Sequence, residues 1–199
     1  MEERTLGNLK VSAMGFGCMG MSHAYGTVST KEEARALLDK AMDMGCNFFD
    51  TAEVYGTADD PHHNEKLLGE LLKTHRNHVK IASKCGLRFD ETAKTVNKPL
   101  IPDGRPETIK ASIEGTLKRL QTDHLDLYYI HRIDTNIPIE ETAGAMKELM
   151  DDGKETMDRA NSRNKKIRQT GRKHEGSRHK IVKGRNRNNG SNVKYDSNV

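Results

Sequence analysis

Strand-like and helix-like stretches alternate along residues 30–153, and this alternation limits the possible folds more than any other feature of the chain. The helical stretches carry apolar residues three and four positions apart and cover residues 30–45, 64–72, 106–120 and 139–150. Short apolar runs lie between them at residues 47–50, 79–84 and 125–130. Strands that alternate with helices usually pair in parallel through right-handed crossovers, so the sequence predicts an α/β fold.

Local signals mark where several of these helices begin and end. Thr30 and Glu33 form a capping box, in which each side chain satisfies a backbone N–H of the other residue. Pro106 suits the first turn of a helix, where a backbone N–H has no intrahelical partner. Gly45 and Gly153 follow two helical stretches directly and are typical of helix ends.

The stretch before residue 30 predicts an additional hairpin and a first strand. Gly7 and Asn8 indicate a hairpin turn, and the strand that follows ends at Gly17-Cys18-Met19. The chain then holds about four strand–helix units. These could form a small open sheet or half of an eight-unit barrel, and periodicity alone does not distinguish the two.

Composition changes abruptly at Gly153. Residues 153–199 hold 14 Lys and Arg against 4 Asp and Glu, a net charge of +10, whereas the residues before them carry a net charge of −6. Only 8 of these 47 residues are hydrophobic, too few to offset the entropy of ordering them. We therefore expect a domain over residues 1–153 and a basic, disordered tail over 154–199.

The cysteines and histidines predict neither a disulfide framework nor a metal site. Three cysteines have no metal-ligand spacing and form no even set, and no secretory signal or membrane-spanning run is visible. No pair among His62, His63, His75 and His78 has the i, i+4 helical spacing of a metal site. We expect a cytoplasmic protein with reduced, buried cysteines and without a bound metal.

Four polar residues follow the ends of successive predicted strands. Asp50 and Tyr55 come after the second strand, Lys84 ends the third, and His131 follows the fourth. In a parallel barrel these strand ends open on one face, where such residues converge in active sites. Each residue taken alone also has a structural explanation, as a turn cap, a surface lysine or a core histidine.

The residues around these four positions resemble the aldo-keto reductase family. The matching stretches are Phe49-Asp50-Thr51-Ala52-Glu53-Val54-Tyr55-Gly56, Asn64-Glu65-Lys66-Leu67-Leu68-Gly69, Ala82-Ser83-Lys84, Leu125 to His131, and the opening Leu6 to Met21. They lie in the family's order with its spacing, from about Leu6 to Gly153. The resemblance implies a (β/α)8 TIM barrel that reduces aldehydes and ketones with NADPH.

The resemblance also implies a role for each residue of the tetrad. Tyr55 would donate the proton to the alkoxide that hydride delivery creates, and the Lys84 ammonium would make that proton easier to release. Asp50 would hold and aim Lys84. His131 would hydrogen-bond the carbonyl oxygen of the substrate.

The same comparison with the family assigns the cofactor side of the pocket. Gly17, Cys18 and Met19, at the end of the first strand, would line the nicotinamide together with Asp50. The residues that bind the cofactor's phosphates belong to the family's later strands and loops, and no stretch of this sequence matches them. A small-molecule carbonyl compound is the expected substrate.

The family pattern stops after Lys154, where a fifth strand should begin. We expect a barrel truncated to about four βα units, and we hypothesise that residues 154–199 are an out-of-frame translation of the second half. The open edges of such a sheet favour self-association. The alternative is a non-catalytic half-barrel fragment or a basic-tailed binding protein, whose tail would contact nucleic acid through phosphates but, with Tyr195 as its one aromatic, without base stacking.

Overall fold

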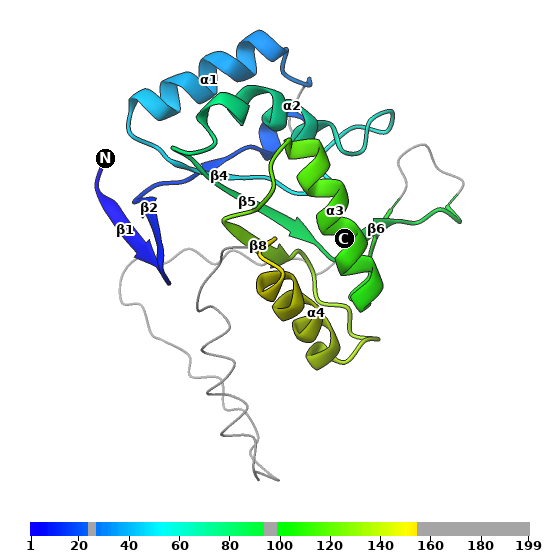
Figure 1. Ribbon diagram of the computed structural model, residues 1–199. Coiled ribbons are helices and arrows are strands. Elements are labelled where there is room, and N and C mark those ends of the chain that lie inside the picture. Colours follow the sequence, from blue (N-terminus) through cyan, green and yellow to red (C-terminus); the bar gives the residue numbers. More distant parts are fainter. Residues whose placement is uncertain (24–26, 94–98, 155–199) are drawn as a thin grey trace, which may run out of the picture.

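A computed structural model describes residues 1–23, 27–93 and 99–154 of the chain (Figure 1). In chain order the elements are β1 (Glu3–Leu6), β2 (Leu9–Ser12), β3 (Phe16–Gly17), the 3-10 helix η1 (Met19–Met21), α1 (Lys31–Asp43), β4 (Phe48–Asp50), α2 (His63–Leu72), the 3-10 helix η2 (Lys73–His75), β5 (Lys80–Cys85), β6 (Leu87–Phe89), β7 (Leu100–Pro102), α3 (Pro106–Leu120), β8 (Leu127–Ile130) and α4 (Ile139–Asp151). Apart from Lys154, the predicted tail over 154–199 and its nucleic-acid binding lie outside the described residues.

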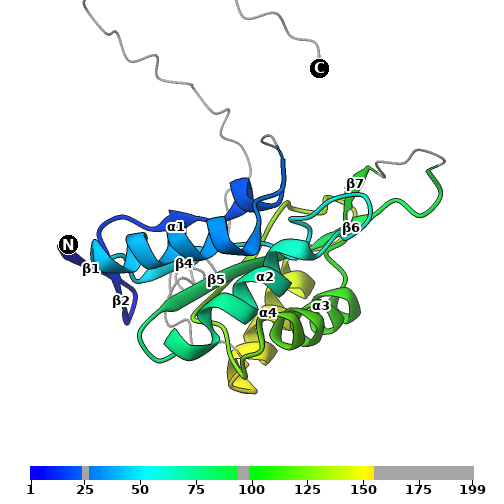
Figure 2. The ribbon, with the colours of Figure 1, turned by 90° about the horizontal axis from the view of Figure 1, so that it is seen from above.

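A four-stranded parallel sheet organises the fold. Its strands lie in the order β3-β4-β5-β8, which is also their order along the chain. Right-handed crossovers that all advance in one direction place their helices on the same side of the sheet. Figures 1 and 2 show α1 to α4 along one side of these strands. This is the wall of a TIM barrel, and it confirms the predicted α/β fold with parallel strands.

The strand register separates an apolar face from a polar one. Phe49, Ile81 and Tyr128 face the helices and are at most 2% exposed. Their neighbours Asp50 and Lys84 alternate with them and point to the opposite face, where both side chains stay partly exposed. The core therefore lies between sheet and helices, and the polar residues gather on the face that would line a barrel interior.

The predicted helix signals are confirmed in detail. The Glu33 N–H donates to Thr30 Oγ1 at 3.2 Å, and the Thr30 N–H donates to Glu33 Oε2 at 2.9 Å, which completes the capping box. Pro106 occupies the first turn of α3. Gly45 follows α1 with a φ of +83°, a left-handed conformation that glycine adopts without strain.

The stretch after β5, where the sequence analysis names no strand, contains two short strands. It forms an antiparallel hairpin in which β6 pairs with β7. Leu87 is buried, and Arg88 Nε forms an ion pair with Asp103 Oδ2 at 3.1 Å across the base of the hairpin. The strands are only three residues long, and such short runs give little periodic signal.

The N-terminal hairpin is as the sequence predicts, with β1 antiparallel to β2 and Gly7 at a φ of +63° in its turn. Cys18, Cys46 and Cys85 are buried, which confirms the predicted burial, and none of the three forms a disulfide. Among the described residues no strand covers the outer edge of β3 or β8, and self-association through these edges stays a prediction. None of the helices described combines the length and apolar character needed to cross a membrane.

Gly69 and Gly144 provide a matched test of helix packing. A Cβ at Gly69 in α2 would lie 2.2 Å from the Arg119 backbone oxygen of α3, whereas a Cβ at Gly144 in α4 would meet nothing within 4 Å. We expect Gly69→Ala to lower the free energy of unfolding by about 1–3 kcal/mol. Gly144→Ala should raise it by about 0.5–1 kcal/mol, through helix propensity alone. Urea denaturation measures both, and a stable Gly69→Ala variant would contradict the close approach of these helices.

Candidate active site

The four predicted catalytic residues come together at the carboxyl ends of the parallel strands. Asp50 is the last residue of β4, and Tyr55 lies in the loop that leads from β4 to α2. Lys84 is the penultimate residue of β5. His131 follows β8 directly, and its backbone N–H donates to the Cys85 carbonyl at 2.8 Å, which fixes it beside the end of β5.

The ammonium group of Lys84 is the centre of this cluster. Lys84 Nζ donates to Asp50 Oδ1, to the Thr51 carbonyl oxygen at 2.7 Å and to the Tyr55 hydroxyl oxygen at 3.2 Å. These bonds use all three donors of the ammonium, whose side chain is only 16% exposed. Because Tyr55 accepts from Lys84, its own hydroxyl proton remains available for another acceptor.

His131 stands edge-on to the Tyr55 ring, with the ring centroids 5.7 Å apart and the planes at 85°. Burial and the nearby Lys84 ammonium lower the pKa of His131 from 6.5 to about 4. Its Nδ1 atom is buried and has no hydrogen-bond partner among the described residues. The imidazole is therefore neutral at pH 7 and can donate one N–H without adding charge.

His23 also belongs to this cluster, although the sequence analysis missed it. Its ring stacks on the Tyr55 ring at a centroid distance of 5.8 Å and an interplanar angle of 18°. Its Nδ1 lies 2.9 Å from the Gly56 carbonyl oxygen, which can only accept, so Nδ1 carries the proton. The one sequence signal for its place in the site was its position shortly after the end of the first strand.

The residues predicted to line a cofactor differ in their exposure. Gly17 is exposed, and a Cβ there would meet nothing within 4 Å, so open space lies in front of it. Met19 begins η1 and is partly exposed. The Cys18 N–H donates to the Asp50 carbonyl at 2.8 Å, and burial raises the pKa of the Cys18 thiol well above its usual range.

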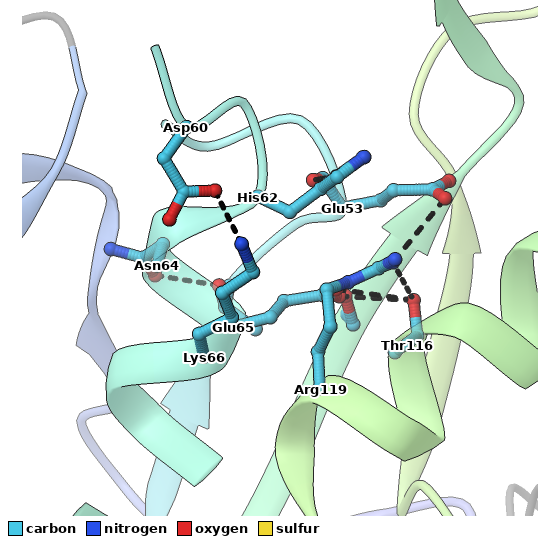
Figure 3. Close-up of polar contacts among 10 residues, drawn as sticks. Glu53, Asp60, His62, Asn64, Glu65, Lys66, Thr116 and Arg119 are labelled. Carbon is cyan, nitrogen blue, oxygen red and sulfur yellow. Dashed lines mark hydrogen bonds and ion pairs between the residues drawn. The ribbon is translucent and has the colours of Figure 1, made fainter. Parts of the chain in front are cut away.

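Asn64 ties the loops around the site to one another. Its Nδ2 donates to the Cys18 carbonyl oxygen and to Ser22 Oγ, both at 2.9 Å, and its Oδ1 accepts from Thr51 Oγ1 at 2.6 Å. The Asn64 side chain is fully buried at the start of α2 (Figure 3). It thus joins the loop after β3 to the loop after β4, which carries Tyr55.

No group of three or more His, Cys, Asp or Glu residues could hold a metal ion within residues 1–23, 27–93 and 99–154. His62 and His63 instead contact protein groups: His62 Nδ1 lies 2.5 Å from the Glu53 carbonyl oxygen, and His63 Nδ1 lies 2.9 Å from Ser22 Oγ. The chemistry of the cluster is therefore that of an ammonium, a phenol, a carboxylate and a neutral imidazole.

Comparison with known proteins matches this arrangement to one family. The sequence model of the Aldo/keto reductase family matches residues 13–155. "Probable aldo-keto reductase 1" of Glycine max is 40% identical over 146 residues, which cover 73% of this chain and 40% of that protein.

Solved structures agree. The holo form of aldo-keto reductase AKR11C1 from Bacillus halodurans superposes with a TM-score of 0.67 at 34% identity, over 78% of this chain and 48% of that one. The glycerol dehydrogenase AKR11B4 from Gluconobacter oxydans gives a TM-score of 0.62 at 30% identity, over 74% of this chain and 44% of that one. The chain thus spans less than half the length of each of these relatives.

The environment of His131 predicts a specific dependence on pH. Its pKa of about 4 lies below the ordinary 6.5 of an unfolded chain, so the unfolded protein binds more protons between these two values. This contribution to stability is complete above about pH 6.5 and is lost as the pH falls through 4. Imidazole NMR titration should give this pKa directly, and His131→Gln should weaken the pH dependence of unfolding. A His131 pKa at or above 6.5 would contradict the burial described here.

Proposed function

This chain belongs to the aldo/keto reductase family, and on that premise we propose that it reduces aldehydes or ketones to alcohols with NADPH. The observation that carries the proposal is the contact of Lys84 Nζ with both Asp50 Oδ1 and the Tyr55 hydroxyl, 3.2 Å away in the latter case. His131 completes the group beside the Tyr55 ring. These are the four residues for which the resemblance to the family implies catalytic roles, with Tyr55 as the proton donor.

The geometry gives each side chain a task in that reaction. Tyr55 receives a hydrogen bond from Lys84, so its proton can pass to the oxygen of a carbonyl as negative charge develops there. The ammonium stabilises the phenolate that is left behind. Asp50 and the Thr51 carbonyl hold the ammonium in place, and their two hydrogen bonds restrict its movement toward solvent.

His131 suits the orientation of the carbonyl oxygen rather than its protonation. With a pKa of about 4 it stays neutral at physiological pH and can donate an N–H to the oxygen. A neutral donor also avoids a second positive charge beside Lys84. Tyr55 and His131 would then approach the same oxygen from two directions.

The residues at the end of β3 fit the nicotinamide part of the cofactor. Gly17 lacks a side chain, has open space before it, and pairs with Asp50 in the sheet. NADPH, when bound, supplies the hydride. Gly17, Met19 and Asp50 would hold its nicotinamide ring, while Cys18 would shape the loop from within through the bonds of its backbone.

Glycerol-sized carbonyl compounds are the first substrates to examine. The related protein from Gluconobacter oxydans is named a glycerol dehydrogenase, which interconverts an alcohol and a carbonyl compound. We extend this substrate class to the present chain as part of the proposal. We also propose a cytoplasmic location, where buried thiols that form no disulfide are usual.

Replacing Tyr55 by Phe tests the proposal. The variant keeps the ring but loses the proton donor, so carbonyl-dependent oxidation of NADPH should fall by about 10²–10⁴-fold. The assay follows NADPH absorbance with glyceraldehyde and a panel of aromatic aldehydes. Tyr128→Phe is the matched control, because Tyr128 lies in the core on the helix side of the sheet and should leave turnover unchanged.

Two results would contradict the proposal in different ways. Undiminished turnover by Tyr55→Phe would overturn the assignment of the proton donor. Absence of carbonyl-dependent NADPH oxidation by the unaltered chain would instead favour the alternative, a non-catalytic member of the family.

A further inference from the structure

A fully buried carboxylate joins three elements behind the catalytic loop. Glu65, in the first turn of α2, is 0% exposed. Its Oε1 accepts hydrogen bonds from Ser83 Oγ of β5 at 2.6 Å and from Thr116 Oγ1 of α3 at 3.0 Å. Its Oε2 accepts from Arg119 Nε of α3 at 2.6 Å. A buried charge is tolerated only with such partners, so Glu65 forms a fixed anchor inside the fold (Figure 3).

Arg119 extends from this anchor to the loop that carries Tyr55. While its Nε binds Glu65, its Nη2 binds Glu53 Oε1 at 3.3 Å (Figure 3). The two side chains of that second pair are only 16% and 13% exposed, so solvent screens it little. A planar guanidinium can serve two carboxylates at once in a fixed geometry, which a lysine ammonium cannot match.

Glu53 lies at the edge of a cleft, although the loop around it is largely buried. Glu53 and Val54 border an open cleft of about 580 Å³, whose other walls include Leu87, Thr108 and Ser112. The Glu53 N–H donates to the Lys84 carbonyl at 3.3 Å, a long bond. On α3, the Arg119 guanidinium and the Ser112 hydroxyl are the polar groups that hold Glu53.

Each carboxylate that Arg119 binds is linked to a segment that carries a proposed catalytic residue. Glu53 is two residues before Tyr55, and Ser83, which donates to Glu65, directly precedes Lys84. The relative position of loop and strand sets the 3.2 Å separation between Tyr55 and the Lys84 ammonium. We propose that Arg119 is a positioning residue, which through Glu53 and Glu65 holds the Tyr55 loop in register with the Lys84 strand.

The kinetic part of this proposal rests on the proposed reductase activity, so the experiment includes a measurement that needs no turnover. The main variant is Arg119→Lys, which retains the charge but loses the fork. Its matched control is Arg76→Lys. Arg76 is 13% exposed and likewise uses several nitrogens, to Asp126 at 2.8 Å, Thr122 Oγ1 at 2.8 Å and the His124 carbonyl at 2.9 Å, but lies just before the amino end of β5.

In the full chain, Arg119→Lys should lower kcat by about tenfold or more. A misplacement of about 1 Å can lower it by roughly 100-fold, which sets the upper limit. KM for the carbonyl compound should change less than about threefold, because the reacting groups rather than the binding surface are displaced. Arg76→Lys should change kcat by less than about threefold, even where both variants lose similar stability. Hydrogen exchange of the peptide over residues 51–56 should become faster in Arg119→Lys and stay unchanged in Arg76→Lys.

Glu53→Met is the second variant: it keeps most of the side-chain volume and removes the oxygen that accepts from Arg119, while Arg119 keeps its bond to Glu65. It should reproduce both effects. Combined with Arg119→Lys, it should add little further loss of kcat, since residues that act as a unit are not additive.

Several results would overturn the positioning role. Unchanged exchange over 51–56 in both Arg119→Lys and Glu53→Met would do so, whatever the kinetics. Equal kinetic losses in Arg76→Lys and Arg119→Lys would reduce the effect to general destabilisation. If the unaltered chain shows no turnover, the proposed function fails, and faster exchange confined to the Arg119 and Glu53 variants still supports the positioning of the loop.

Discussion

Parallel pairing of four strands in one register is the constraint on which the rest of the molecule depends. Gly17, Asp50, Ala82 and Leu127 lie in one row across the sheet, each paired with the next. Once this row is set, the alternation of side chains decides which residues enter the core and which face the opposite side. The loops that follow the strands then begin at the same end of the sheet. Residues far apart in sequence therefore meet around Lys84 without long loops.

Much of this could be predicted from the sequence, because the signals are local and repeat. The spacing of apolar residues indicates the buried face of each helix. The capping box of Thr30 and Glu33 marks a helix start through local hydrogen bonds that need no tertiary context. The tetrad positions were predictable because polar residues such as Asp50 and Lys84 lie at or near the carboxyl ends of strands, in stretches that resemble the family. The parallel fold then places the four side chains near one another, as the structure shows. Their roles in a reaction stay predictions.

Other features could not be predicted, because they depend on contacts between distant segments. A charged residue on an amphipathic helix is normally assigned to the solvent, and nothing local distinguishes Glu65 or Arg119 from such residues. The stacking of His23 on Tyr55 depends on the path of a loop. The hairpin of β6 and β7 pairs residues such as Leu87 and Pro102, which lie fifteen residues apart in a stretch of weak pattern.

The enclosed thiol of Cys18 has a chemical consequence if carbonyl compounds are the substrates, as we propose. Aldehydes and their unsaturated relatives are electrophiles, and the thiolate of a cysteine is the nucleophile they attack. Cys18 stands directly beside Asp50, yet it is 0% exposed and burial holds it in the thiol form. Its backbone contributes to the shape of the pocket while its sulfur stays out of reach. A reactive compound that enters the proposed site would therefore not meet the thiolate of Cys18.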